Sequence, residues 1–304
     1  MIHHHITKVR VRALIGIVLG TWLLLQCHDT LSERASQRQD RQMASAWGGV
    51  LRSNEALASL FREARAPLQP RLEQLADNDP VGFFEMLLDR YDRSVRDYIC
   101  VFTKQELVCG RMTAKQVMKA HFREDPFSVR LEWIENRDKA ARVLYVEDAW
   151  VQKGRQMAVV EPGPIARIFV PYVMRPIHGE DAKKASRRTI DQFGFRNSLQ
   201  LILKYCRLAR AQGILDFTYE GTRVVDGRDT LLFERRLPYT GEEGPWPDGV
   251  LEVYVDKQLL VPTLCLAYAD QAKDELLGHY QYTDIEINAN LDRAVFTKEG
   301  MGVE

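Results

Sequence analysis

The residues best suited to proton-transfer chemistry lie close together in one short segment. The sequence Pro-Ile-His-Gly-Glu-Asp places His178 within three positions of Glu180 and Asp181. An imidazole beside a carboxylate is a common pair in general acid–base catalysis. The segment therefore leaves open a hydrolase that uses the 178–181 loop. The same stretch is rich in proline, which is equally typical of a solvated loop.

Other patterns that carry catalytic or metal chemistry are missing from the sequence. It contains no GxGxxG, GxxxxGK[ST], HExxH, GxSxG or CxxC motif. His121, His178 and His279 are far apart and lack the spacing of metal ligands. We therefore predict no catalytic residue with an established pattern, no metal and no cofactor.

Four cysteines follow the N-terminal region: Cys100, Cys109, Cys206 and Cys265. Export would permit disulfides between them. Cys100 and Cys109 have opposite parity, so a straight strand would place them on opposite faces. The apolar neighbours of each cysteine favour buried free thiols, and the sequence alone does not decide the pairing.

The charge balance of the chain argues against nucleic-acid binding. The chain of 304 residues has 42 Lys and Arg against 42 Asp and Glu, with 45% hydrophobic and 28% charged residues. Such a composition is typical of a globular protein. Nucleic-acid binders usually carry a basic surplus, so we predict no nucleic-acid partner.

The N-terminus has the pattern of an export signal. Lys8, Arg10 and Arg12 precede an uncharged apolar run at 13–25. Thirteen residues are fewer than the roughly 20 that span a bilayer as a helix, which favours a signal within 1–27. Cleavage, lipidation of Cys27 after the unusual Gln26, and retention as an anchor stay open. In each case we predict membrane contact through residues 11–27 and a periplasmic or cell-envelope location.

Residues 28–78 are predicted to form a polar helical spacer, and residues 79–300 the main domain. Apolar residues recur at three- and four-residue steps over 81–96, after Asp79 as a cap and Pro80 at the first helical position. A second such stripe predicts a helix over 198–211. Asn197 or Ser198 is its expected cap, with Gly213 just beyond its end.

Strands account for most of the rest of the domain. Residues 127–133 alternate without error, so Phe127, Val129, Leu131 and Trp133 share one apolar face. Asp226-Gly227 marks a tight hairpin. About eleven strands joined by short turns predict an antiparallel, mainly β (α+β) domain whose apolar face is covered by the two helices.

Several segments together resemble domain-of-unknown-function family 1571. They are Asp79–Phe83, Tyr98–Glu106, Pro126–Val129, Val143–Val146, Phe193–Phe195 and Tyr280–Asn288. The family in turn resembles periplasmic lipoprotein carriers and outer-membrane lipoprotein-sorting proteins. The resemblance implies a curved, half-open antiparallel β-barrel around an apolar cavity that helices cover. It supplies no catalytic residues.

This resemblance implies an exported, non-enzymatic carrier or chaperone that binds a lipid or the acyl chain of a lipoprotein. The sheet residues expected to line its cavity are Phe102, Met118, Phe122, Val129, Leu131, Trp133, Leu264 and Leu266. Apolar stripes of this kind also form solidly packed cores. A cell-envelope interaction or structural domain with a packed barrel and an envelope protein partner is therefore the alternative, beside the hydrolase.

Overall fold

The computed structural model describes residues 68–137 and 139–303. The compact unit to which they belong begins at Pro67. The signal or anchor predicted within 1–27 and most of the predicted spacer lie outside the described residues. Within the described part, no helix combines the length and apolar character needed to span a membrane.

Helix α5 (Pro80–Ser94) confirms the first predicted helix. The Asp79 side chain caps it by accepting a 2.9 Å hydrogen bond from the backbone N–H of Gly82. One face of α5 is buried, including Phe83, Phe84 and Leu87. The apolar spacing of the sequence thus becomes the face that packs on the sheet.

Helix α8 (Phe195–Ala211) begins earlier than the sequence predicts. Its N-cap is Gly194, at φ +106°, so the prediction of a cap at Asn197 or Ser198 is wrong. Both predicted caps lie in the first turn instead. The Asn197 amide donates to the carbonyl of Phe193, and the Ser198 hydroxyl donates to that of Gly194.

Helix α4 (Leu68–Asn78) comes from the end of the predicted spacer. Its Leu72 and Ala76 side chains are buried in the main hydrophobic core. The folded unit therefore starts with α4 rather than at Asp79.

Thirteen strands form one sheet in the described residues, and every strand pairing is antiparallel. Their order is β6-β7-β5-β4-β3-β1-β13-β12-β11-β10-β9, with β2 beside β1 and β8 beside β7. The strands are β1 (Asp97–Val108), β2 (Arg111–Met112), β3 (Gln116–Arg123), β4 (Ser128–Glu135), β5 (Ala140–Val146), β6 (Val151–Gln152), β7 (Arg155–Pro162), β8 (Val173–Pro176), β9 (Asp216–Val225), β10 (Arg228–Arg236), β11 (Val250–Asp256), β12 (Pro262–Tyr268) and β13 (Leu276–Ile287). The mainly β antiparallel fold predicted from the sequence is confirmed.

Tight turns make this meander possible. Asp226 and Gly227 both have positive φ in the predicted β9–β10 hairpin, and so do Cys109 and Gly110 after β1. The proline-rich stretch contains only short elements, as its composition predicts: α6 (Pro164–Arg167), β8, α7 (Glu180–Ala185) and the 3-10 turn η2 (Ile190–Gln192).

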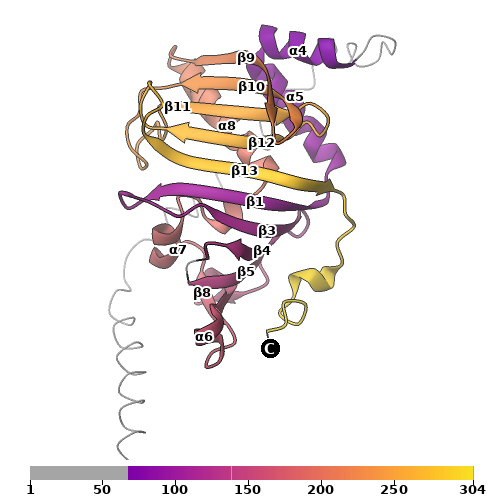
Figure 1. Cartoon of the computed structure of the whole chain (residues 1–304), viewed down its shortest axis with the longest axis vertical. Helices are drawn as coiled ribbons and strands as arrows, with labels where there is room; N and C mark the ends of the chain where they lie inside the picture. Colours follow the sequence, from indigo (N-terminus) through magenta and orange to yellow (C-terminus); the bar gives the residue numbers. More distant parts are fainter. Residues whose placement is uncertain (1–67, 138, 304) are drawn as a thin grey trace, which may run out of the picture. The chain divides into compact units, whose positions relative to one another are not determined.

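Helices α5 and α8 cover the same face of the sheet, which we call the helix-side face (Figure 1). Phe83 and Phe84 of α5 contact Phe233 of β10, with ring centroids 5.1 and 5.0 Å apart. The opposite face has its own smaller core beside β5 and β7. There Leu144 and Val159 pack with Phe296 from the C-terminal turn η3 (Arg293–Phe296).

Candidate functional site

A row of half-buried apolar side chains crosses the helix-side face at the β4–β8 end of the sheet. Leu131 of β4 pairs with Val143 of β5, Val143 with Val160 of β7, and Val160 with Val173 of β8. Directly paired residues point to the same face. All four side chains are half-buried. We call these four residues the apolar row.

Trp133 stands beside this row, two positions beyond Leu131 on the same strand face. Its indole N–H is buried and has no hydrogen-bond partner in the described part of the chain. Buried donors are nearly always paired, so an unpaired indole N–H in an apolar setting calls for a physical explanation. An oxygen atom of a bound molecule would supply the missing acceptor.

Four other predicted cavity residues lie in a filled part of the same face: Phe102, Met118, Phe122 and Val129. Phe193, just before α8, packs on Phe102 with ring centroids 5.1 Å apart. Tyr98 stacks on Phe122 at 4.6 Å. These contacts are those of a packed core, so the structure brings only Leu131 and Trp133 to its half-buried edge.

Leu264 and Leu266 lie on the opposite face of the sheet, which corrects the prediction that they share a wall with the others. Their cross-strand partners on β11 are Tyr254 and Glu252, whereas the core-facing Val253 pairs with Cys265. Strand β12 has apolar residues at both parities, so the alternation of the sequence does not tell its two faces apart.

A buried polar group lies on the helix-side face near the end of β1. Glu106 is fully buried and accepts three side-chain hydrogen bonds, from Lys104 at 2.9 Å, Ser186 at 2.8 Å and Tyr280 at 2.9 Å. The Lys104 ammonium also donates to the Ser186 hydroxyl at 2.9 Å. The Glu106 carboxylate therefore holds both Lys104 and Ser186 in one buried, hydrogen-bonded ion pair.

The predicted His178 loop has a different partner from those in its own segment. The Nε2 atom of His178 lies 3.3 Å from the carboxylate of Asp191, which also accepts a 2.6 Å hydrogen bond from Thr189. Asp181 instead lies 3.9 Å from Arg175. Although burial raises the pKa of Asp191, the hydrogen bonds from His178 and Thr189 hold it below its ordinary value. His178 thus has a carboxylate partner, Asp191, that lies outside the 178–181 segment.

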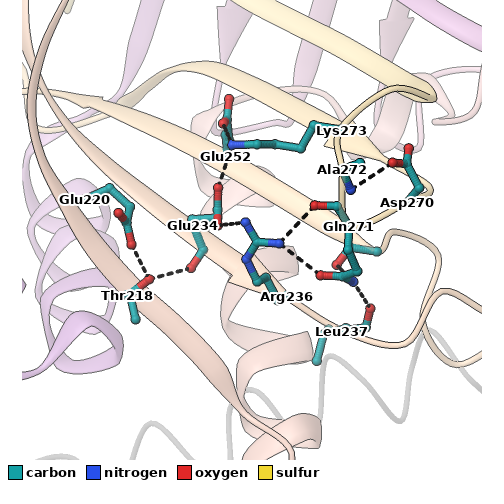
Figure 2. Close-up of polar contacts among 11 residues, drawn as sticks. Thr218, Glu220, Glu234, Arg236, Leu237, Glu252, Asp270, Gln271, Ala272 and Lys273 are labelled. Atoms are coloured by element: carbon teal, nitrogen blue, oxygen red, sulfur yellow. Dashed lines mark hydrogen bonds and ion pairs between the residues drawn. The ribbon is translucent and has the colours of Figure 1, made fainter.

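The face of the sheet opposite the helices carries a second charged cluster, which Figure 2 shows. Glu234 of β10 and Glu252 of β11 pair directly across the strands. The Lys273 ammonium lies between them, at 2.8 and 2.6 Å from their carboxylates. Arg236 binds Glu234 and also donates to Gln271, so the cluster fixes the loop before β13 to the sheet. Nothing in the sequence pattern marked this cluster, because its members come from three separate segments: β10, β11 and the loop before β13.

The remaining candidates for reactive or metal-binding groups are the cysteines and the metal-ligating side chains. The four cysteines of the described part are free, with Cys100 and Cys206 buried as predicted and Cys109 exposed. Burial raises the pKa of the Cys100 thiol, which makes it unreactive. No cluster of three or more metal-ligand side chains occurs among the described residues.

The fold and the apolar row define a class: a largely antiparallel β-sheet protein whose helix-covered face keeps a half-buried apolar edge. Within it, the chain belongs to the family described as "Protein of unknown function (DUF1571)", whose family model matches residues 95–300. The resemblance seen in the sequence is thereby confirmed. No curated protein matches the chain.

The solved structures that match this chain include the following three. A DUF1329 family protein from Desulfovibrio piger has 13% identity and a TM-score of 0.38, covering 74% of this chain and 100% of that one. The lipoprotein LppX from Mycobacterium tuberculosis has 11% identity and a TM-score of 0.36, covering 70% and 98%. A LolA superfamily protein from Nitrosomonas europaea has 12% identity and a TM-score of 0.24, covering 71% and 98%. None of these similarities transfers a ligand to this chain.

Proposed function

We propose that the protein is an exported, non-enzymatic carrier or chaperone that holds an acyl chain of a lipid or lipoprotein along the apolar row. The observation that carries the proposal is the row itself: Leu131, Val143, Val160 and Val173 are directly paired, apolar and only half-buried. Covering such side chains with an alkyl chain is favourable by about 25 cal/mol per Å² of apolar surface.

The length and polarity of the row suit such a ligand. Four strands at the usual spacing extend over about 14 Å, which is comparable to an extended medium-length alkyl chain. The unpaired indole N–H of Trp133 lies beside the row and would donate to a carboxyl or ester oxygen. In this proposal residues 11–27 contact the membrane and the chain after them lies in the periplasm or cell envelope.

The test compares two substitutions on one strand. Leu131→Glu places a charge in the row, whereas Ile134→Glu places the same charge near the end of β4, on a side chain that is 58% exposed. We expect Leu131→Glu to abolish uptake of a fluorescent fatty acid and Ile134→Glu to leave it near the wild-type level. Thermal melting of both variants separates loss of binding from loss of folding.

One observation favours the packed-domain alternative, an envelope interaction domain without a ligand. Phe193 and Phe195 fill the helix-side face next to Phe102 and Phe122, so part of the expected cavity is occupied by the chain's own side chains. If wild-type protein never binds the probe and Leu131→Glu fails to fold, this alternative replaces the carrier. A Leu131→Trp variant that folds and still takes up the probe would also count against the row as the binding site.

A further inference from the structure

The connection between β7 and β8 exposes a compact group of large apolar side chains. Ile165 and Phe169 are each 81% exposed, Ile168 is 79% and Val170 is 43% exposed. We call these four residues the apolar tip. Most exposed apolar side chains on soluble proteins are scattered singly, whereas a contiguous group marks a surface that another phase or partner covers.

The tip is a folded feature of the chain. The backbone N–H groups of Arg167 and Val170 donate to the carbonyls of Gly163 and Ala166, each at 3.0 Å. The guanidinium of Arg167 binds the buried carboxylate of Glu161 at 2.8 Å. These contacts hold the backbone in one short helical turn, so the outward direction of the apolar side chains is built into the fold.

The charges around the tip are mainly basic: Arg142 and Arg167 share one buried partner, Glu161, and Arg175 lies 3.9 Å from Asp181. Residues 162–179 include Arg167 and Arg175 but no Asp or Glu. Lys139 is exposed, and its carbonyl accepts a 3.0 Å hydrogen bond from the backbone N–H of Gly163, at the start of the tip segment. Apolar side chains within a basic rim complement a bilayer surface, where acyl chains lie beneath anionic headgroups.

We propose that the apolar tip inserts into the interface of a bilayer that contains anionic lipids. This contact would be separate from the one predicted for residues 11–27. The tip segment joins β7 to β8 at the lower end of the sheet in Figure 1, and these two strands carry Val160 and Val173 of the apolar row. Insertion therefore brings the row to the membrane surface, where an acyl chain would enter it. Only this last step rests on the proposed function.

The experiment uses the full chain with a polarity-sensitive NBD label at the tip. Exposed or N-terminal thiols are removed by Cys27→Ser and Cys109→Ser, and the label is attached through Ile168→Cys. The matched control carries the label through Val224→Cys. Val224 is 68% exposed and lies in β9, at the opposite edge of the sheet. Both proteins share the same N-terminus, so recruitment by residues 11–27 is common to them.

The probes are vesicles of phosphatidylcholine alone or with phosphatidylglycerol as a minor component. With anionic vesicles, we expect the label at 168 to shift to the blue and to be quenched by spin-labelled acyl chains. Its quenching by aqueous iodide should fall about three-fold or more, as for a side chain buried in the headgroup region. The label at 224 should keep its iodide quenching in both lipids.

Two results would overturn the proposal. One is equal iodide quenching of the two labels in the presence of anionic vesicles. The other is concentration-dependent protection of the label at 168 without any lipid, which would make the tip a contact between copies of the chain. The Leu131→Glu variant distinguishes this proposal from the carrier function. If the wild-type tip inserts but the protein takes up no fatty acid, only the carrier function is contradicted. If the protein takes up fatty acid but the tip does not insert, only the proposal of tip insertion is contradicted.

Discussion

The guanidinium of Arg235 donates a 2.8 Å hydrogen bond to the carboxylate of Asp248, and both side chains are almost completely buried. Arg235 belongs to β10, and its guanidinium also donates to the carbonyl of Ile202 in α8 at 3.3 Å. It lies over the ring of Tyr205, 5.4 Å from the centroid. One buried cation thus joins the sheet, the covering helix and the loop before β11.

Removing the acidic partner of this pair should be strongly destabilising. In Asp248→Ala the buried guanidinium loses its counter-charge, which we expect to lower the free energy of unfolding by about 3–5 kcal/mol. Replacing both residues, as Arg235→Met with Asp248→Leu, should recover much of the loss because no charge stays buried. Urea denaturation of the full chain in mild detergent measures both. A double variant as unstable as the sum of the two single variants would contradict the expectation.

The start of α8 depends on a glycine that no other residue replaces easily. Gly194 has φ +106°, and a Cβ there would lie 2.8 Å from the Tyr98 hydroxyl and 3.1 Å from a ring carbon of Phe122. We expect Gly194→Ala to reduce the free energy of unfolding by about 2–4 kcal/mol through strain and overpacking. Gly213→Ala is the matched control, since φ is +70° there but a Cβ meets nothing within 4 Å. It should lose only about 1 kcal/mol. Equal losses in the two variants would show that the contacts with Tyr98 and Phe122 are unimportant.

Strands β4 and β12 show which face assignments can be predicted from the sequence and which cannot. The alternation of 127–133 assigned the apolar face of β4 correctly, because Val129 is buried in the main core and Phe127, Leu131 and Trp133 pack against it. The same reasoning failed for Leu264 and Leu266, because β12 is apolar on both faces. Register with β11 and β13 decides which side faces the helices, and register is a property of pairing rather than of one segment.

Long-range packing accounts for the other differences. Asn197 and Ser198 are good caps by residue type, but Gly194 caps α8 instead. The reason is that Phe193 and Phe195, on either side of it, pack among Phe102, Phe122 and Tyr282. The apolar stretch after Pro164 was visible in the sequence. Its exposure could not be predicted, because it depends on the fold. Strands β7 and β8 pair with each other, and the segment that joins them is left exposed in the described part of the chain.

Lys273, which binds Glu234 and Glu252 in the charged cluster of Figure 2, should stabilise the sheet by neutralising their charges. Glu234 and Glu252 are directly opposite each other, so Lys273→Met leaves two facing carboxylates that repel. Since Lys273 is partly exposed, we expect a loss of only about 1–2 kcal/mol at pH 7. Lys184→Met, at an exposed position of α7, is the control and should change little.

The pH dependence of that loss identifies its cause. Although burial raises the pKa of Glu234, hydrogen bonds from Lys273 and Arg236 hold it below its ordinary value of 4.5. A carboxyl whose pKa is lowered in the folded state stabilises it above the unfolded pKa, and the contribution disappears as pH falls. The difference between Lys273→Met and wild type should therefore shrink below about pH 4.5. A difference that stays constant with pH would point to lost packing of the lysine stem instead.

We expect protonation linked to His121 to lower the stability of the protein at a higher pH than protonation of the carboxylates does. Burial lowers the pKa of its imidazole from 6.5 to about 4, and the nearby Glu132, 3.9 Å away, only partly offsets this effect. The folded state therefore keeps His121 neutral, while the unfolded chain takes up a proton near pH 6.5. The contribution of His121 to stability is fully present above that pH and is lost as pH falls from about 6.5 to about 4. The total loss is roughly 3–4 kcal/mol. Urea unfolding of wild type and His121→Asn across this range measures the contribution. The variant should show a flatter profile, with a remaining slope from His279, whose pKa burial also lowers. Parallel profiles for the two proteins would assign the pH dependence to other groups.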